Sequence, residues 1–463
     1  MRLSYLLVLI LAPLLGATQP LAHKSLESEI VCESLPIQGE VPSWIEGTFY
    51  RNGPAKFEAG GESVNHWFDG LAMLHAFALK NGKVSYTNQF LRSSNYTEMM
   101  EHNSINFSGF AQDPCRVHFQ HSQIHNANVN VAKIAEEYVA LTEFPLPVRF
   151  DPHTLETLGV LDYADQLPHE QCFESAHPHV EADESIINYL IEFGRETIYH
   201  IYRISPGTNT RTSLAKIPVT NPSYMHSFSQ TERYLIFVEY PFTVNPLDLI
   251  QKTKPYISNF KWEPEKGSRL LVVDKKTGEL VKTLHTQPFF SFHHINAFEK
   301  EDQIILDLIS YDSPAVIQDL YLDAKSSHTK HRVSRLTLDL SVETVTMELL
   351  SDVEMELPRI NDNFDGKGYQ YVYGYDVNAL YKLNTADKTH KKWSEERCLP
   401  SEPVFIPSPH GQEEDDGVVL SVILDEKSAS SFLLILDAHT FEEVSRARVP
   451  HHIPAGLHGQ FYR

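Results

Sequence analysis

Short runs of β-forming residues, each closed by a turn and followed by a second short run, recur along the chain. Asp, Asn, Gly or Pro stands between the paired runs, which is the pattern of a β-hairpin. Seven such units follow one another, within residues 76–86, 148–160, 201–207, 270–281, 334–339, 379–384 and 433–444. Their spacing of roughly 45 to 75 residues is close to one blade of a β-propeller, so the chain is predicted to be all-β with seven blades. A large β-sandwich with unrelated hairpins is the alternative that the pattern leaves open.

Helical patterns are scarce in this sequence. Residues 246–251 and 314–324 are the two short stretches with helical character, and both interrupt the hairpin repeat. Each is therefore predicted to be an insertion between strands of the propeller.

The N-terminus has the features of a secretory signal. Arg2 supplies a positive start, residues 3–15 form an apolar run that is short for a membrane span, and Gly16 and Ala17 offer a cleavage site. Residues 1–22 are predicted to be the signal peptide, with a signal anchor as the alternative, and residues 23–463 a single domain. Sequons at Asn95 and Asn106 agree with a secreted or lumenal protein.

Charge and cysteine content narrow the functional classes. The formal net charge is −22, which makes a nucleic acid a poor partner. The four cysteines show neither zinc-finger spacing nor a CxxC motif, and in an oxidising compartment they allow two disulfides in any of three pairings.

Two adjacent histidines, His293 and His294, lie in an apolar, strand-like run. Neighbouring strand residues face opposite sides, so one of the two is expected to point inward. Three other stretches carry a similarly placed histidine, at His177, His226 and His458. The innermost strands of a propeller surround one axis, so one histidine from each of four blades can meet there. Four imidazoles without thiolates or carboxylates suit iron, copper or zinc and argue against calcium.

Residues alone do not select these four from the 24 histidines of the chain. His66, His75, His179, His294, His451 and His452 compete with them as ligands. An imidazole that ligates a metal usually donates its second N–H to a carboxylate. Glu143, Glu356 and Glu402 lie at the ends of apolar strands and are the carboxylates expected in that role, although an ordinary edge position explains each of them as well.

Several motifs, taken together and in order, resemble the carotenoid cleavage oxygenases, and most closely their animal members. They are FYRNGP at 49–54, HWFDGLAMLH at 66–75, AHPHVE at 176–181, YMHSF at 224–228, FHHIN at 292–296, SEPV at 401–404, EEDDGVVLSV at 413–422 and the His458-Gly459 pair. The resemblance implies a seven-bladed propeller with Fe(II) on its axis, held by His177, His226, His293 and His458 and capped by helical insertions. Glu143, Glu356 and Glu402 match the glutamates that hold the ligating imidazoles in this family.

The implied reaction adds dioxygen across a conjugated double bond of a carotenoid or apocarotenoid and yields aldehydes such as retinal. No catalytic residue is assigned beyond the metal centre. A retinoid ester isomerohydrolase and a secreted, non-catalytic carrier of carotenoids or retinoids remain as alternatives. Residues 113–116 (DPCR) resemble part of the loop through which animal members touch membranes, which implies peripheral membrane contact at that point.

Overall fold

The hairpin of residues 71–90 shows how the sequence pattern becomes a blade. Asn81 and Gly82 both have positive φ (51° and 72°), as a tight two-residue hairpin turn requires, and they join β6 (Leu71–Lys80) to β7 (Lys83–Phe90). Along β7 every second residue from Val84 onward is buried, which is the alternation of a strand with one face in the core. The sequence prediction of a hairpin here is confirmed.

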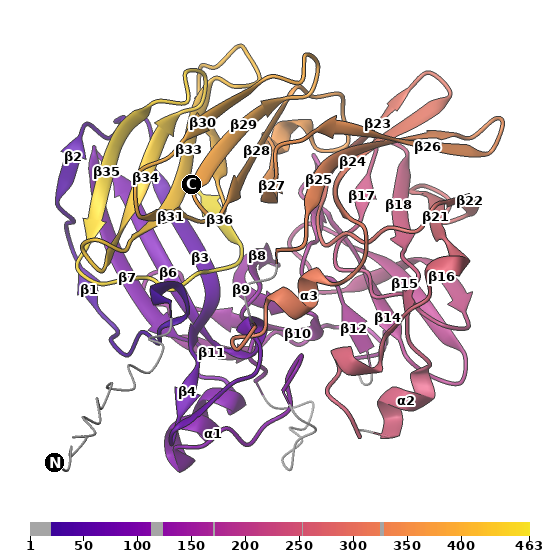
Figure 1. Ribbon diagram of the computed structural model, residues 1–463, viewed down its shortest axis with the longest axis horizontal. Coiled ribbons are helices and arrows are strands. Elements are labelled where there is room, and N and C mark those ends of the chain that lie inside the picture. Colours follow the sequence, from indigo (N-terminus) through magenta and orange to yellow (C-terminus); the bar gives the residue numbers. More distant parts are fainter. Residues whose placement is uncertain (1–19, 113–123, 170–171, 252, 325–327) are drawn as a thin grey trace, which may run out of the picture.

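The computed structural model describes residues 20–112, 124–169, 172–251, 253–324 and 328–463. Setting aside two small two-stranded sheets, β4 (Glu58–Ala59) with β5 (Glu62–Ser63) and β19 (Phe242–Thr243) with β20 (Lys261–Trp262), the described residues form seven sheets. These are the seven blades of a β-propeller (Figure 1), and each of the seven predicted hairpins belongs to a different one. The sandwich alternative is wrong.

The first three blades are built mainly from strands before residue 220, and blade 1 also contains the C-terminal strand. Blade 1 consists of β1 (Val31–Cys32), β7, β6, β3 (Gly47–Lys56) and β36 (Gly459–Tyr462). Blade 2 consists of β11 (Thr157–Val160), β10 (Phe144–Phe150), β9 (Glu137–Thr142) and β8 (Asn130–Ile134). Blade 3 consists of β12 (Cys172–Glu174), β13 (His179–Val180), β14 (Ile186–Glu192), β15 (Thr197–Ile204) and β16 (Arg211–Val219).

The other four blades follow in chain order. Blade 4 consists of β17 (Ser229–Gln230), β18 (Tyr234–Glu239), β21 (Ser268–Asp274) and β22 (Leu280–Thr286), and blade 5 of β23 (His294–Lys300), β24 (Gln303–Tyr311), β25 (His331–Asp339) and β26 (Thr344–Ser351). Blade 6 consists of β27 (Glu356–Arg359), β28 (Tyr371–Asp376), β29 (Ala379–Asn384) and β30 (His390–Trp393). Blade 7 consists of β31 (Cys398–Pro400), β32 (Val404–Pro407), β33 (Gly417–Asp425), β34 (Ser430–Asp437), β35 (Glu443–Val449) and β2 (Ile37–Gly39).

The two ends of the chain close the ring. The C-terminal strand β36 pairs with β3 in blade 1, and the N-terminal strand β2 pairs with β35 in blade 7. The indigo and yellow strands accordingly lie side by side in Figure 1. This closure places His458, the residue before β36, at the axis.

Helices occur only as short insertions in the described residues. They are α1 (Ser94–His102), α2 (Pro246–Gln251) and α3 (Val316–Asp319), with 3-10 turns at Leu21–His23, Trp67–Asp69, Ile257–Asn259, Pro264–Lys266 and Asp362–Phe364. The predicted insertions at 246–251 and 314–324 correspond to α2 and α3, whereas α1 was not predicted. None of these helices is long and apolar enough to cross a bilayer.

Some predictions fall partly or wholly outside the described residues. These are most of the signal segment 1–22, Cys115 and the motif at 113–116, so signal cleavage and membrane contact stay predictions. The sequence left the pairing of the four cysteines open, and Cys32 and Cys398 are free thiols in the structure. Asn95 is only 6% exposed within α1, where a glycan finds no room, whereas Asn106 is half-buried.

Candidate metal centre and substrate cavity

The four predicted histidines gather at the axis. One donor nitrogen from each of His177, His226, His293 and His458 lies within 4.8 Å of the other three. The ring centroids of His177 and His458 are 4.4 Å apart, and those of His177 and His226 are 4.6 Å apart. The sequence prediction that distant stretches bring these four side chains together therefore agrees with the geometry.

Each of these histidines precedes an innermost strand rather than lying within it. His177 comes two residues before β13, His226 three before β17, His293 one before β23 and His458 one before β36. The expectation that they lie on the strands themselves is wrong in this detail. At the axis the chain has no further strand to pair with, so the segment that leads into each blade is free to turn a side chain inward.

Three glutamates hold three of the imidazoles by Nδ1. Glu356 bonds His293 at 2.6 Å and Glu402 bonds His458 at 2.8 Å, while Glu143 makes a shorter bond to His226. A carboxylate can only accept, so each Nδ1 carries the proton and each Nε2 keeps a lone pair for the centre. Among the described residues, His177 has no such carboxylate.

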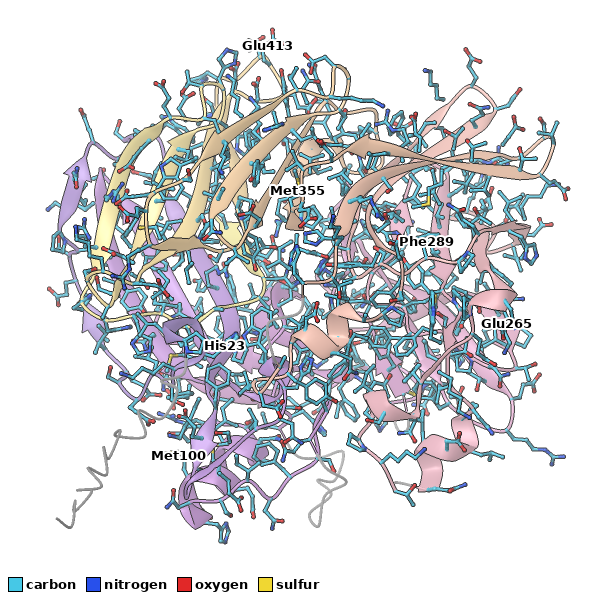
Figure 2. The ribbon with its side chains drawn as sticks, viewed as in Figure 1. His23, Met100, Glu265, Phe289, Met355 and Glu413 are labelled. Atoms are coloured by element: carbon cyan, nitrogen blue, oxygen red, sulfur yellow. The ribbon has the colours of Figure 1, made fainter. Side chains whose placement is uncertain are left out.

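Every blade contributes one group to this arrangement. The histidines come from blades 3, 4, 5 and 1, and the glutamates come from blade 2 (Glu143), blade 6 (Glu356) and blade 7 (Glu402). Met355, which precedes Glu356 and is fully buried, marks this central region in Figure 2. The ring of blades is thus the scaffold that sets the position of all seven side chains.

The nitrogens at the centre fit a metal cation. The Nε2 atom of His293 is buried and has no hydrogen-bond partner among the described residues, and those of His177 and His226 face each other at 2.9 Å. Burial, followed by the neighbouring imidazoles, lowers the pKa of His177 well below its usual range, and burial lowers the pKa of His458 to about 4. Neutral imidazoles with converging lone pairs are the donor set of a divalent transition metal.

Glu402 is also the anion for two arginines, the buried Arg51 and the partly buried Arg359. Its carboxylate is fully buried and lies 3.6 Å from Arg51 and 3.4 Å from Arg359. Burial alone would raise the pKa of Glu402, but His458, Arg359 and Arg51 hold it at about 2. This carboxylate therefore remains charged at neutral pH and neutralises cations that have little access to solvent.

The competing histidines have other partners. His179 bonds Asp365 and a backbone carbonyl, and His294 bonds Ser229 and Tyr240 on the side of the strand away from the centre. The remaining competitors are likewise engaged with hydroxyl or carbonyl groups, namely His66, His75, His451 and His452. The inference that only one of His293 and His294 faces inward is confirmed.

A cavity of about 650 Å³ opens onto the histidines. His226, His293 and His458 form part of its wall, and most of the rest is apolar or aromatic. Leu249 of α2 together with Val316 and Leu320 in and after α3 contribute to the lining, so these insertions cover the site as expected. In Figure 1 α3 lies near the middle of the molecule, and α1 and α2 lie at its lower margin. The cavity has the size and character of a site for an apolar ligand.

Sequence reasoning missed the residues that support this site. The hydroxyl of Tyr224 donates to Glu143, and that of Tyr311 donates to Glu356. Asp69, in the HWFDG motif, accepts the backbone N–H groups of Phe110 and Ala111 and so anchors a segment of the cavity wall. Burial raises the pKa of Asp69 to about 7. The one signal in the sequence for a supporting residue was the position of Tyr224, two residues before the predicted ligand His226.

Comparisons with known proteins agree with the motifs. A β,β-carotene 15,15′-dioxygenase from Gallus gallus is 32% identical over 502 residues, which cover 92% of this chain and 94% of that protein. A mitochondrial carotenoid-cleaving dioxygenase from Homo sapiens is also 32% identical and covers 92% of this chain and 88% of its own.

Solved structures extend the likeness to the fold. A variant of the Synechocystis apocarotenoid oxygenase superposes with a TM-score of 0.88 at 26% identity, covering 96% of this chain and 98% of that one. A cobalt-substituted form of that oxygenase superposes with a TM-score of 0.85 at 28% identity. Residues 23–463 match the family described as retinal pigment epithelial membrane protein. The chain therefore belongs to this family, the carotenoid cleavage oxygenase family whose motifs it carries.

Proposed function

We propose that this protein is an Fe(II)-dependent dioxygenase that cleaves a conjugated double bond of a carotenoid to give apocarotenoid aldehydes such as retinal. The observation that carries the proposal is the opening of an apolar cavity of about 650 Å³ onto four converging imidazoles. The two relatives named above support the substrate class, because their names describe them as enzymes that cleave carotenoids.

Iron bound by His177, His226, His293 and His458 would supply the activation of dioxygen. The four ligands are neutral, so the full charge of the cation is retained at the centre. Glu143, Glu356 and Glu402 keep three of the imidazoles in the tautomer and orientation that ligation requires.

The cavity wall has the task of positioning the substrate. Phe292 packs against His226 with ring centroids 5.5 Å apart, so a polyene that follows this wall is brought beside the metal ligands. Holding one double bond in register with a reactive centre accounts for much of a rate enhancement, and it needs no general acid or base. None is assigned here.

Incubation of iron-loaded protein with β-carotene in detergent under air is expected to yield an aldehyde product, measured by chromatography. Retinal would identify cleavage at the central bond, and a longer apocarotenal would identify cleavage elsewhere. Unchanged β-carotene in the presence of confirmed iron would contradict β-carotene as the substrate.

A variant that narrows the cavity tests whether the polyene is cleaved inside the cavity or elsewhere on the protein. Val316→Trp adds bulk to the wall at α3 and is expected to lower turnover by at least about tenfold with unchanged iron content, because the polyene is displaced from its register. Val342→Trp lies in an exposed turn and should behave as wild type. Equal turnover in all three proteins would place cleavage outside this cavity.

Two other functions are distinguished by the same assay. A retinoid ester isomerohydrolase would convert a retinyl ester to an isomerised alcohol without consuming oxygen. A secreted carrier would bind the polyene and leave it intact. The retention of all four histidines and three glutamates favours the dioxygenase, because a carrier has no need of a metal site.

We also propose that the chain enters the secretory pathway and is secreted or lumenal. The support is the sequence of residues 1–22, with Arg2 before the apolar run 3–15 and small residues after it. Expression in a eukaryotic secretory host, followed by N-terminal sequencing, should find a mature terminus near residue 23. A cytosolic product that retains Met1 would contradict this.

A further inference from the structure

We propose that His328, His331 and Glu354 form a second metal site, which binds a divalent transition metal of the zinc type. One donor atom from each residue lies within 4.8 Å of the other two. Its residues are separate from the seven side chains of the four-histidine centre. The inference does not depend on the cleavage reaction.

Two adjoining segments of the fold supply these residues. His331 is the first residue of β25 in blade 5, His328 precedes it by three positions, and Glu354 lies between β26 and β27. The carboxylate of Glu354 is already in hydrogen-bond contact with Nε2 of His328. Two of the three donors are thus in contact with each other before a metal binds.

The nitrogen of His331 points to a missing ligand. His331 is only 9% exposed, and its Nε2 atom is buried without a hydrogen-bond partner among the described residues. Its Nδ1 atom lies 3.4 Å from the carbonyl oxygen of Thr329, so Nε2 is the nitrogen left for a cation. A simple surface ion pair between His328 and Glu354 would leave this nitrogen unexplained, because buried polar atoms are normally paired.

The donor set selects the class of metal. Two imidazoles and one carboxylate are a common ligand set for Zn²⁺, which leaves a fourth position for water, whereas Ca²⁺ and Mg²⁺ prefer oxygen alone. Tetrahedral zinc holds its donors about 3.4 Å apart, so His328 and Glu354, which are in hydrogen-bond contact, must move apart slightly to admit the cation. The side chain of His328 is 60% exposed and is free to make that movement, while His331 is held by packing of its ring against Tyr311 at 5.3 Å.

Tyr311 connects this site to the wall of the cavity. Its ring packs against His331, its hydroxyl donates to Glu356, and it lines the cavity. The backbone N–H of Thr329 donates to Asp319 at the end of α3, which covers the cavity. A metal bound here would therefore tie β25, the entry to β27 and the α3 insertion together, and we assign it a stabilising role at the cavity wall.

The test is zinc binding by the full chain after it has been loaded with iron. Titration calorimetry and metal analysis after dialysis are expected to show one zinc per chain in addition to the iron, with a rise in the unfolding temperature. His328→Ala and Glu354→Gln should weaken zinc binding by at least about tenfold with unchanged iron. His328 is exposed, so its removal should leave the fold intact, which circular dichroism checks.

Two controls separate this site from others on the molecule. His439→Ala alters a second cluster (Asp415, Asp416 and His439), in which Asp415 is already paired with Lys382, and should bind zinc as wild type does. A His293→Ala variant has lost the axial centre and should still bind one zinc. Equal zinc binding by wild type and His328→Ala, no zinc beyond the iron, or zinc that only replaces iron would each overturn the proposal.

Discussion

Replacing His293 with alanine is expected to remove iron from the protein and abolish carotenoid cleavage, whereas replacing its neighbour His294 should leave iron bound. The two residues are adjacent in sequence, yet Nε2 of His293 faces the other three imidazoles and His294 bonds Ser229 and Tyr240 instead. His293→Ala deletes one of the four donors in a buried centre, the imidazole that Glu356 holds, and three donors would remain for the cation.

His294→Ala serves as the matched control. It leaves two hydroxyl groups in the interior without their partner, so it is expected to lower the free energy of unfolding by about 1–3 kcal/mol. Iron content by metal analysis and product formation by chromatography should nevertheless stay near wild type. Full iron and activity in His293→Ala, or loss of iron in a folded His294→Ala protein, would reverse the assignment of this pair.

Replacing Glu402 with glutamine is expected to cost both stability and iron affinity. The carboxylate orients His458 and also neutralises Arg51 and Arg359, and of these groups only Arg359 is partly exposed. The variant leaves the buried Arg51 without its anion, which we expect to lower the free energy of unfolding by about 3–5 kcal/mol, whereas Arg359 keeps Asp362 at 3.7 Å. A neutral amide is a weaker acceptor for the His458 imidazole than a carboxylate, so iron binding should weaken by about 10–100-fold.

Glu143→Gln separates the two effects. Glu143 holds His226 in the way that Glu402 holds His458, but its other described partner is the hydroxyl of Tyr224, not a cation. It should lower iron affinity by a similar factor with a much smaller loss of stability, as measured by chemical denaturation of the metal-free proteins. If the two variants are equally stable, the arginines do not depend on Glu402 for their charge balance.

Much of the architecture was readable from local patterns. Turn residues such as Asn81-Gly82 and the Asp residues that end apolar strands specify hairpins through φ preferences and side-chain acceptors, which act within a few positions. Their repetition indicated seven blades. Helix α1 was not predicted because its nine residues carry little apolar periodicity. Cysteine spacing says nothing about distance, so the sequence could not show that Cys32 and Cys398 are free thiols.

The functional site could be predicted only in part from local sequence patterns. Physics of the residues alone did not choose four ligands from 24 histidines, and the choice of His177, His226, His293 and His458 came from the family's motifs. The supporting roles of Tyr224, Tyr311 and Asp69 and the two arginines beside Glu402 were not anticipated. Each of these contacts joins residues that lie 40 or more positions apart in the chain. No turn or helix signal, which acts over a few positions, could therefore indicate them.

By itself the sequence determined the strands, their turns and the family, because strand alternation and turn chemistry are local and motifs are read in order. Only the tertiary structure decided which carboxylate holds which imidazole, and that His328, His331 and Glu354 meet. Those outcomes depend on the closure of seven blades around one axis, where groups far apart in the chain are brought within a few ångströms. No short-range preference encodes that distance.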